Sequence, residues 1–351
     1  MNMSHKPLLA ITMGDPAGIG PEIIVKALGE PRLYDICTPL VVADPMVIGH
    51  AVSEIVHANC RVNIVPTPEA AHSKAGIIDV LPLEGVDLTG FVPGKLAARC
   101  GDGAFQSVKK AIELALSKQV DGTVTAPLNK EAMNLAGHHY DGHTEIYAKL
   151  TNTERYCMML ADGRLRVAHV TTHMPLAKVS EALTVERILE VIHLGHDACC
   201  SLGIEDPRIG VAGFNPHAGE NGLFGNEEQV SITPAIKAAQ QKGIQATGPF
   251  SPDTVFCKAA GGGFDLVVAM YHDQGHIPMK MQSFIYDDTT GSWSGMTGVN
   301  VTLGLPIIRS SVDHGTAFEN AGKNIASHKS MVNAIEYAAM LAGGSTEGLS
   351  R

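Results

Sequence analysis

The sequence predicts an α/β fold with a mainly parallel sheet, divided into two lobes around a cleft. Short apolar runs alternate with stretches whose apolar residues recur at helical spacing, and this alternation is typical of a parallel sheet flanked by helices. The chain also has 351 residues, which is more than one hydrophobic core usually supports. We therefore expect two α/β lobes rather than one.

The expected elements follow one another along the whole chain. The first apolar run, Leu8–Met13, predicts a strand, and Gly14–Gly20 predicts a loop before a helix with proline in its first turn. In chain order, further strands are expected at Pro39–Ala43, Gly122–Ala126, Leu165–Thr171, Arg208–Phe214 and Phe264–Met270, and helices at Pro21–Leu28, Asp102–Lys118, Thr184–Leu202 and Ala334–Leu341. Residues 281–298 have no periodicity, so we expect a long irregular loop there.

Composition limits the classes of partner. The net charge of −10 argues against a binder of nucleic acid or of anionic membranes, because both need a basic face. No apolar run reaches membrane-spanning length. Seven cysteines without a C-x-x-C pair fit reduced thiols, and the polar start Met1–Lys6 does not resemble a signal peptide. We expect a cytoplasmic enzyme.

Three histidines each follow a predicted strand at its carboxyl end: His173 in TTHMP, His217 in NPHAGE and His272 in YHDQG. Open α/β sheets bind ligands outside the carboxyl ends of their strands. Three imidazoles that meet there could hold a divalent metal and leave positions open for substrate. A single histidine among 16 is more often structural, and the spacings match no local metal motif, so only the fold could bring the three together.

The loop Gly14–Glu22 follows the first strand and opens a helix. Glycine-rich turns at this place let backbone N–H groups and the helix N-terminus face an anion. The spacing is neither that of the dinucleotide fingerprint nor that of a Walker A loop. A plain tight turn is the alternative.

Several residues could bind a phosphate. His143 and Thr144 begin a helical stretch and could donate hydrogen bonds to one, although Thr144 could instead be a simple helix cap. Thr125–Lys130 lies at another strand end, where the alternative is a turn. Asn300 and Arg309 bracket an apolar run; Arg309 suits bidentate binding of a phosphate or carboxylate, and a structural salt bridge is the alternative.

Eight motifs then carry a family resemblance. They are MGDPAGIGPE, TAPLNK, GHTE, THMPL, NPHAGENGLFGNEE, YHDQGHIPMK, VNVTLGLPIIR and DHGTAFENAGK, and they occur in this order from about Leu8 to the closing helix. Together they resemble the 4-hydroxythreonine-4-phosphate dehydrogenase family of vitamin B6 biosynthesis. GIGPE and HGTA are also similar to motifs of the wider β-decarboxylating dehydrogenases, such as isopropylmalate dehydrogenase.

The resemblance implies two α/β/α lobes around a central cleft, like those of isocitrate and isopropylmalate dehydrogenases, in a homodimer with the active site at the interface. Residues 1–130 and 305–351 would form the NAD-binding lobe, and residues 131–304 the lobe for substrate, metal and dimerisation. His173, His217 and His272 fall on the family's metal ligands, one of them supplied by the partner subunit. The substrate contacts would be His143, Thr144, Lys280, Asn300 and Arg309. The NAD contacts would be Gly14, Asp15, Gly18, Gly20, His314, Gly315, Thr316 and Ala317.

The implied reaction is an oxidation of a secondary alcohol that lies β to a carboxylate, with hydride transfer to NAD (or NADP) and then loss of CO2. A bound metal would lower the pKa of the hydroxyl. Zn, Co and Mn suit neutral imidazole ligands, and Mg is possible with added oxygen ligands. Lys280 or Asp273 could move the proton.

Two departures concern the substrate. The segment between Lys280 and Asn300 is longer than expected for the biosynthetic enzymes, and NPHAGENGLFG and His276 are closer to the catabolic branch. That branch oxidises 4-phospho-D-threonate or 4-phospho-D-erythronate. A dehydrogenase of cis-dihydrodiol carboxylates and a non-redox phosphoacyl transferase are the alternatives. We expect the segment Met281–Gly298, which contains Trp293, to act as a lid.

Overall fold

The computed structural model describes residues 6–289 and 292–343, so most of the polar start that argued against a signal peptide lies outside the described residues. The chain forms two compact units. Unit 1 contains Met1–Glu154, Gly295–Val299 and Leu305–Arg351, and unit 2 contains Arg155–Ser294 and Asn300–Gly304. No described helix is long and apolar enough to cross a membrane.

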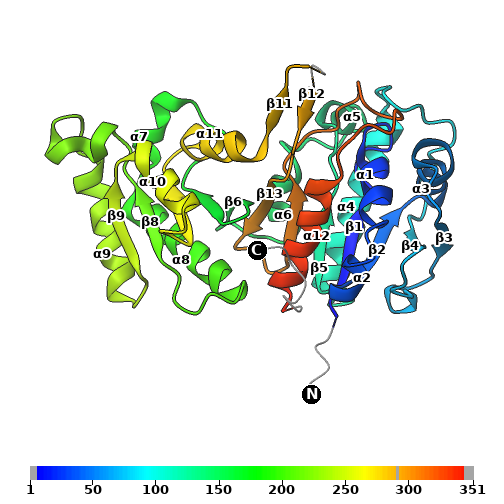
Figure 1. The fold of residues 1–351 in the computed structure, drawn as a ribbon, viewed down its shortest axis with the longest axis horizontal. Coiled ribbons are helices and arrows are strands. Elements are labelled where there is room, and N and C mark those ends of the chain that lie inside the picture. Colours follow the sequence, from blue (N-terminus) through cyan, green and yellow to red (C-terminus); the bar gives the residue numbers. More distant parts are fainter. Residues whose placement is uncertain (1–5, 290–291, 344–351) are drawn as a thin grey trace. The chain divides into compact units, whose positions relative to one another are not determined.

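Unit 1 is built on parallel strands (Figure 1). In spatial order they are β3 (Arg61–Ile64), β4 (Ile77–Pro82), β2 (Thr38–Ala43), β1 (Leu8–Thr12), β5 (Gly122–Thr125) and β14 (Arg309–Val312). The central strands β1, β2 and β5 are almost wholly buried, which explains the apolar runs in β1 (LLAIT) and β2 (TPLVVA).

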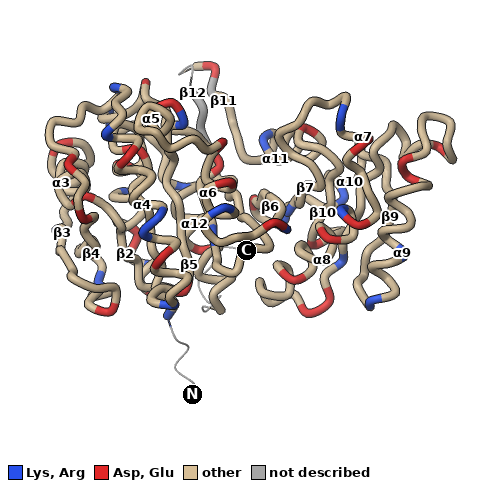
Figure 2. The backbone as a smooth tube through the Cα atoms, turned by 180° about the vertical axis from the view of Figure 1, so that it is seen from behind, with Lys and Arg blue, Asp and Glu red and all other residues tan. Residues whose placement is uncertain are grey.

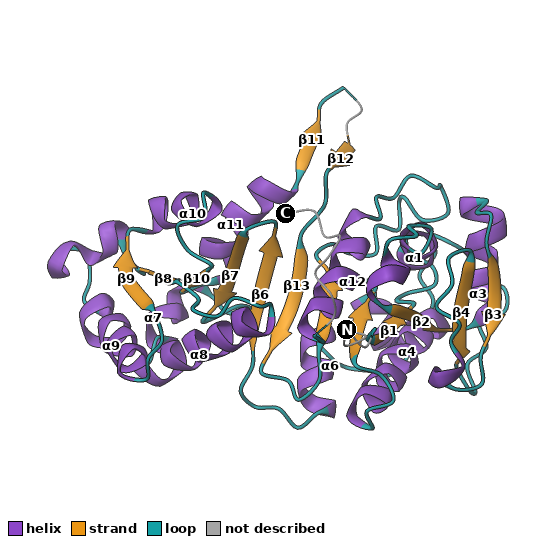
Figure 3. Ribbon diagram, turned by 60° about the horizontal axis from the view of Figure 1, so that its bottom comes forward, coloured by secondary structure: helices purple, strands orange, loops and turns teal. Residues whose placement is uncertain are grey.

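Helices cover both faces of this sheet (Figures 1 and 3). They are α1 (Gly20–Ala27), α2 (Leu33–Ile36), α3 (Pro45–His50), α4 (Ala98–Leu116), α5 (Lys130–Leu135), α6 (His143–Leu150) and α12 (Lys329–Leu341). Apolar side chains of α4, α5 and α6, among them Phe105, Met133 and Tyr147, form one buried cluster. This shared core places residues 131–154 in unit 1, whereas the boundary that we predicted would have assigned them to the second lobe.

Unit 2 has the strand order β6 (Cys157–Asp162), β7 (Leu165–His169), β10 (Leu266–Ala269), β8 (Ile209–Ala212) and β9 (Ala246–Phe250), with β13 (Val299–Leu303) beside β6. All these pairs from β7 to β9 are parallel, and β6 runs antiparallel to β7. The helices are α7 (Val179–Ala182), α8 (Val185–Ser201), α9 (Thr233–Gln241), α10 (Pro252–Ala260) and α11 (His272–Ser283). The predicted α/β class with a mainly parallel sheet is confirmed.

The prediction of an irregular loop at residues 281–298 was wrong. Met281–Ser283 complete α11, and β11 (Ile285–Asp287) pairs antiparallel with β12 (Ser292–Ser294) in a hairpin that projects beyond α11 (Figure 3). The strands have three residues each, too few for an alternating pattern to show in the sequence. The lid function of this segment stays a prediction.

Charged residues are dispersed rather than gathered. Along the backbone of each unit, Lys and Arg positions are interspersed with Asp and Glu positions (Figure 2).

Gly101→Ala is expected to destabilise unit 1. A Cβ at Gly101 would lie 2.1 Å from the backbone carbon of Ala132, where α4 meets α5, so the helices would have to move apart. We expect the free energy of unfolding to fall by about 2 kcal/mol or more, although alanine is the better helix former. Urea denaturation measures this. Gly49→Ala is the matched control, because nothing lies within 4 Å of a Cβ there; equal losses in the two variants would contradict the packing argument.

Candidate active site

The three predicted metal ligands follow three adjacent strands. β7, β10 and β8 are neighbours and run parallel, so their carboxyl ends lie at one edge of the sheet. His173 comes after β7, His217 comes after β8, and His272 is the first residue of α11, which follows β10. The expected strand-end positions are confirmed.

Two of these histidines lie together. The ring centroids of His173 and His272 are 5.6 Å apart. His217 lies in the turn Pro216–Gly222, where its ring faces Phe224 at a centroid distance of 6.4 Å. Within residues 6–289 and 292–343, no three His, Cys, Asp or Glu side chains form a group that could hold a metal ion. The single chain therefore brings together two of the three predicted ligands.

A carboxylate orients His272. The Nδ1 atom of His272 lies 2.7 Å from Oδ1 of Asp273, which leaves Nε2 as the ligand atom. A carboxylate on the second ring nitrogen is the usual support of a metal-binding histidine, so the donor set fits a divalent cation. Asp273, which we considered as a proton carrier, thus contacts a predicted ligand. Lys280, the other candidate, has its Nζ 4.2 Å from the ring centroid of Phe284.

His276 was not expected to be part of the site. Its ring stacks on that of His272 at a centroid distance of 3.6 Å, and its Nδ1 lies 2.9 Å from the carbonyl oxygen of His272. Behind it, burial lowers the pKa of His169 to about 3, with a smaller contribution from His276. The spacing of four residues on a helix is the signal that could have predicted the pair.

Arg309 is the centre of a second group, in unit 1. It begins β14 and is 3% exposed. Its Nη2 donates to Oγ1 of Thr125 over 3.1 Å and its Nη1 lies 3.4 Å from Oγ1 of Thr144, while the guanidinium lies over the ring of Tyr147. These hydroxyl and ring contacts leave phosphate binding by Arg309 a prediction, with a structural salt bridge as the alternative.

His143 lies at the N-terminus of α6 beside this arginine. Its buried Nε2 has no hydrogen-bond partner in the described part of the chain. Burial, and then the charge of Arg309, lower the pKa of His143 well below its usual value, so the ring is neutral at pH 7. The idea that Thr144 caps α6 was wrong: the N-cap is Gly142, and no side chain caps the helix. A buried guanidinium, two hydroxyls, an imidazole and a helix N-terminus fit a phosphate.

Asn300 lies on β13 and belongs to unit 2. Its Oδ1 atom is buried and accepts no hydrogen bond from the residues that the structure describes. A buried amide oxygen without a donor fits a site whose ligand supplies one. The predicted role of Asn300 in substrate binding is therefore compatible with its surroundings.

The glycine-rich loop uses its own backbone amides. The N–H groups of Asp15, Gly18 and Ile19 donate to Pro127 O, Asp15 O and Thr316 O, and the amide of Ala17 donates to the Asp15 carboxylate. At Gly14, which has φ +69°, a Cβ would lie 2.4 Å from Pro127 O. These contacts favour the tight turn over an anion-binding loop, because the amides that would face an anion are already bound.

The HGTA segment packs against that loop. Thr316 closely approaches Gly18, and Glu22 accepts from the amide of Ala326. Gly315 is open, with nothing within 4 Å of a Cβ, and Ala317 has a left-handed φ of +41°. Burial raises the pKa of Asp15 to about 6, and the backbone hydrogen bond from Ala17 opposes this. Contacts with NAD stay predictions for all eight residues of the two segments.

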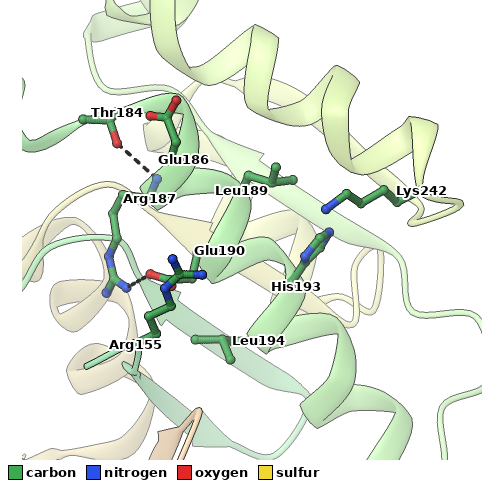
Figure 4. A pocket seen from close by; sticks show the side chains of 9 residues that line it. All are labelled: Arg155, Thr184, Glu186, Arg187, Leu189, Glu190, His193, Leu194 and Lys242. Atoms are coloured by element: carbon green, nitrogen blue, oxygen red, sulfur yellow. Dashed lines mark hydrogen bonds and ion pairs between the residues drawn. The ribbon is translucent and has the colours of Figure 1, made fainter. Parts of the chain in front are cut away.

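A cavity of about 590 Å³ lies along α8 in unit 2 (Figure 4). Its lining contains charged groups that neutralise one another. Glu190 accepts from Arg187 at 2.6 Å and lies 3.5 Å from Arg155, while Lys242 and His193 lie on the other side. None of the predicted site residues lines this cavity.

Comparisons with known proteins agree with this geometry. The family model of the pyridoxal phosphate biosynthetic protein PdxA matches residues 35–338. The D-threonate 4-phosphate dehydrogenase of Salmonella typhimurium is 47% identical, over 95% of this chain and 98% of the relative. The 4-hydroxythreonine-4-phosphate dehydrogenase of Desulforapulum autotrophicum is 44% identical, over 96% of each.

A solved structure extends the likeness to the fold. The crystal structure of 4-hydroxythreonine-4-phosphate dehydrogenase from Klebsiella pneumoniae has a TM-score of 0.83 and 44% identity to this chain, and it covers 96% of this chain and 99% of its own. The family model, the full-length relatives and the solved structure all indicate the same family. The chain therefore belongs to the PdxA family, and it is a dehydrogenase of the PdxA type.

Proposed function

We propose that this dehydrogenase uses NAD and one divalent metal per subunit to oxidise a 4-phosphorylated 3-hydroxy acid, which then loses CO2. The observation that carries the proposal is the buried group of Arg309, Thr144 and His143 at the N-terminus of α6. It offers a guanidinium, hydroxyl groups and a neutral imidazole beside a helix N-terminus, and this set suits a phosphate dianion.

The side chains have separate roles in this mechanism. Arg309 binds and orients the phosphate with its planar fork, and neutral His143 donates from its ring without adding charge. Asp273 fixes the tautomer of His272. When bound by His173, His217 and His272, a divalent cation supplies Lewis acidity at the substrate hydroxyl. Lys280 is the candidate for carrying the proton.

Relatives and motifs together define three candidate substrates. The names of the relatives cover D-threonate 4-phosphate and 4-hydroxythreonine 4-phosphate at similar identity, between 44% and 47%. NPHAGENGLFG and His276 favour the catabolic compounds, 4-phospho-D-threonate and 4-phospho-D-erythronate. The substrate class is therefore a four-carbon hydroxy acid with a terminal phosphate.

A substrate screen tests the proposal. Purified enzyme with NAD (and NADP in parallel) and Zn, Co, Mn or Mg is given 4-phospho-D-threonate, 4-phospho-D-erythronate or 4-phosphohydroxy-L-threonine. NADH formation and CO2 release are expected with one of them and not with its dephosphorylated form. Turnover that does not depend on the phosphate would refute the role of the Arg309 group.

We also propose that the enzyme is a homodimer. Large apolar side chains are exposed next to each predicted metal ligand and on the hairpin: Met174 and Leu176, Leu223 and Phe224, Ile277 and Met281, and Ile285 and Tyr286. Exposed apolar residues that accompany functional segments mark an interface, and an isolated two-stranded hairpin is marginally stable in water. All seven cysteines are free thiols, which supports a reducing, cytoplasmic location.

A further inference from the structure

The turn that carries His217 has an unusual backbone. Five consecutive residues have left-handed φ and ψ values: His217 (52°, 30°), Ala218 (53°, 44°), Gly219 (75°, −8°), Glu220 (43°, 57°) and Asn221 (58°, 29°). Four of the five carry a Cβ, and such residues visit this region singly rather than in runs. A run of this kind persists only where surrounding contacts hold it.

One buried carboxylate binds the residues that lead into this run. Glu228, which is 4% exposed, lies in the helical turn Glu228–Ile232. Its Oε1 accepts from the backbone amides of Phe214 and Asn215, each over 2.7 Å, and its Oε2 accepts from Nδ2 of Asn215 over 3.0 Å. These three donors belong to the two residues before Pro216, and the left-handed run begins after that proline, so Glu228 fixes the segment that leads into the run.

Close packing leaves little room for another arrangement. A Cβ at Gly219 would lie 2.6 Å from Oε2 of Glu228, and one at Gly213 would lie 2.8 Å from the Cα of Ala218. The left-handed run therefore folds back over the carboxylate. Replacing the carboxylate therefore changes both the hydrogen bonds that precede the run and the packing of Gly219 against Glu228.

We propose that Glu228 is a positioning residue that sets His217 for its role in the site. Its hydrogen bonds go to Phe214 and Asn215, and it acts on His217 by holding the left-handed run in which His217 is the first residue. The proposal rests on the proposed function for what His217 binds. The carboxylate of Glu227, by contrast, accepts from Asn215 Nδ2 and from Ser180 Oγ, each over 2.7 Å, and takes no backbone amide of the turn.

The test compares Glu228→Gln with Glu227→Gln in the full-length enzyme. Glu228→Gln keeps the shape of the side chain, but it replaces one carboxylate oxygen by an NH2 group. That group cannot accept a hydrogen bond from the donors that the carboxylate binds. Exchange of the amide hydrogens of Phe214 and Asn215 is expected to accelerate at least about tenfold in Glu228→Gln, and the zinc affinity is expected to fall about 10–100-fold. Both quantities stay near wild type in Glu227→Gln. Thermal melting checks that the variants are folded.

The outcomes separate this proposal from the proposed function. Unchanged amide exchange in folded Glu228→Gln overturns it, as does wild-type zinc affinity in that variant. If the wild-type enzyme binds no zinc, the metal part of the proposed function fails, and amide exchange still decides whether Glu228 holds the turn. If Glu228→Gln does not fold, Asn215→Ala removes one of the three bonds, and unchanged exchange at Phe214 in that variant overturns the proposal.

Discussion

Replacing His272 by alanine is expected to reduce kcat/KM about 1,000-fold or more, because the proposed cation would supply several kcal/mol of charge stabilisation at this place. His272 lies 5.6 Å from His173 between ring centroids and is oriented by Asp273, so its loss would remove both a predicted ligand and the partner of a carboxylate. The side chain is about one-third exposed, so the fold should survive. NADH formation, zinc content and thermal melting measure the three effects.

His196→Ala is the matched control for this variant. His196 is also a histidine next to an aspartate, Asp197, with its Nδ1 3.2 Å from the carboxylate, but it lies on α8 and is not one of the predicted ligands. We expect wild-type turnover and zinc content in that variant. A His272→Ala enzyme that keeps zinc and turnover would remove His272 from the proposed metal site.

The parts of the site that could be predicted from sequence are those whose placement follows from sheet geometry. His173, His217 and His272 were expected at strand ends, and parallel strands present their carboxyl ends at the same edge. β7, β10 and β8 are indeed adjacent and parallel. What sequence could not show is that His217 leaves its strand through a left-handed turn, because such a turn depends on a carboxylate 11 residues further along the chain.

Local motifs predicted the site less well than sheet geometry did, because one motif can fit two different structures. The loop Gly14–Gly20 has the composition of an anion-binding turn, yet its amides bind Pro127 and Thr316, which are more than 100 residues away in sequence. Thr144 has the residue type of an N-cap, but a guanidinium from β14 takes its hydroxyl. In both cases the local sequence fits two structures equally well, and a contact with a residue far away in the sequence determines which one forms.

Arg309→Lys is expected to lower kcat/KM for the phosphorylated substrate by about 100-fold, mainly through KM. The guanidinium of Arg309 contacts Thr125 and Thr144 at the same time. Lysine has a single ammonium group, so at least one charged hydrogen bond would be lost. We expect this loss to weaken binding by about 3 kcal/mol in total. Burial lowers the pKa of Arg309 to about 10, against a smaller opposite effect of Tyr147, so the guanidinium is still protonated at pH 7. A lysine starts from a lower pKa and would lose its charge more readily in the same surroundings.

The measurement must distinguish a lost phosphate contact from a weakened fold. Arg99→Lys is the matched control, because Arg99 also belongs to unit 1 but is exposed and donates to the backbone oxygens of Thr89 and Gly90. Affinity for inorganic phosphate should fall in Arg309→Lys and not in Arg99→Lys, while both proteins melt near the wild-type temperature. Because Arg309 is 3% exposed, a purely structural arginine would show the opposite: a lower melting temperature with unchanged phosphate affinity and unchanged KM. That result would mean that Arg309 does not bind the phosphate. The mechanism would then lose the charged group next to His143.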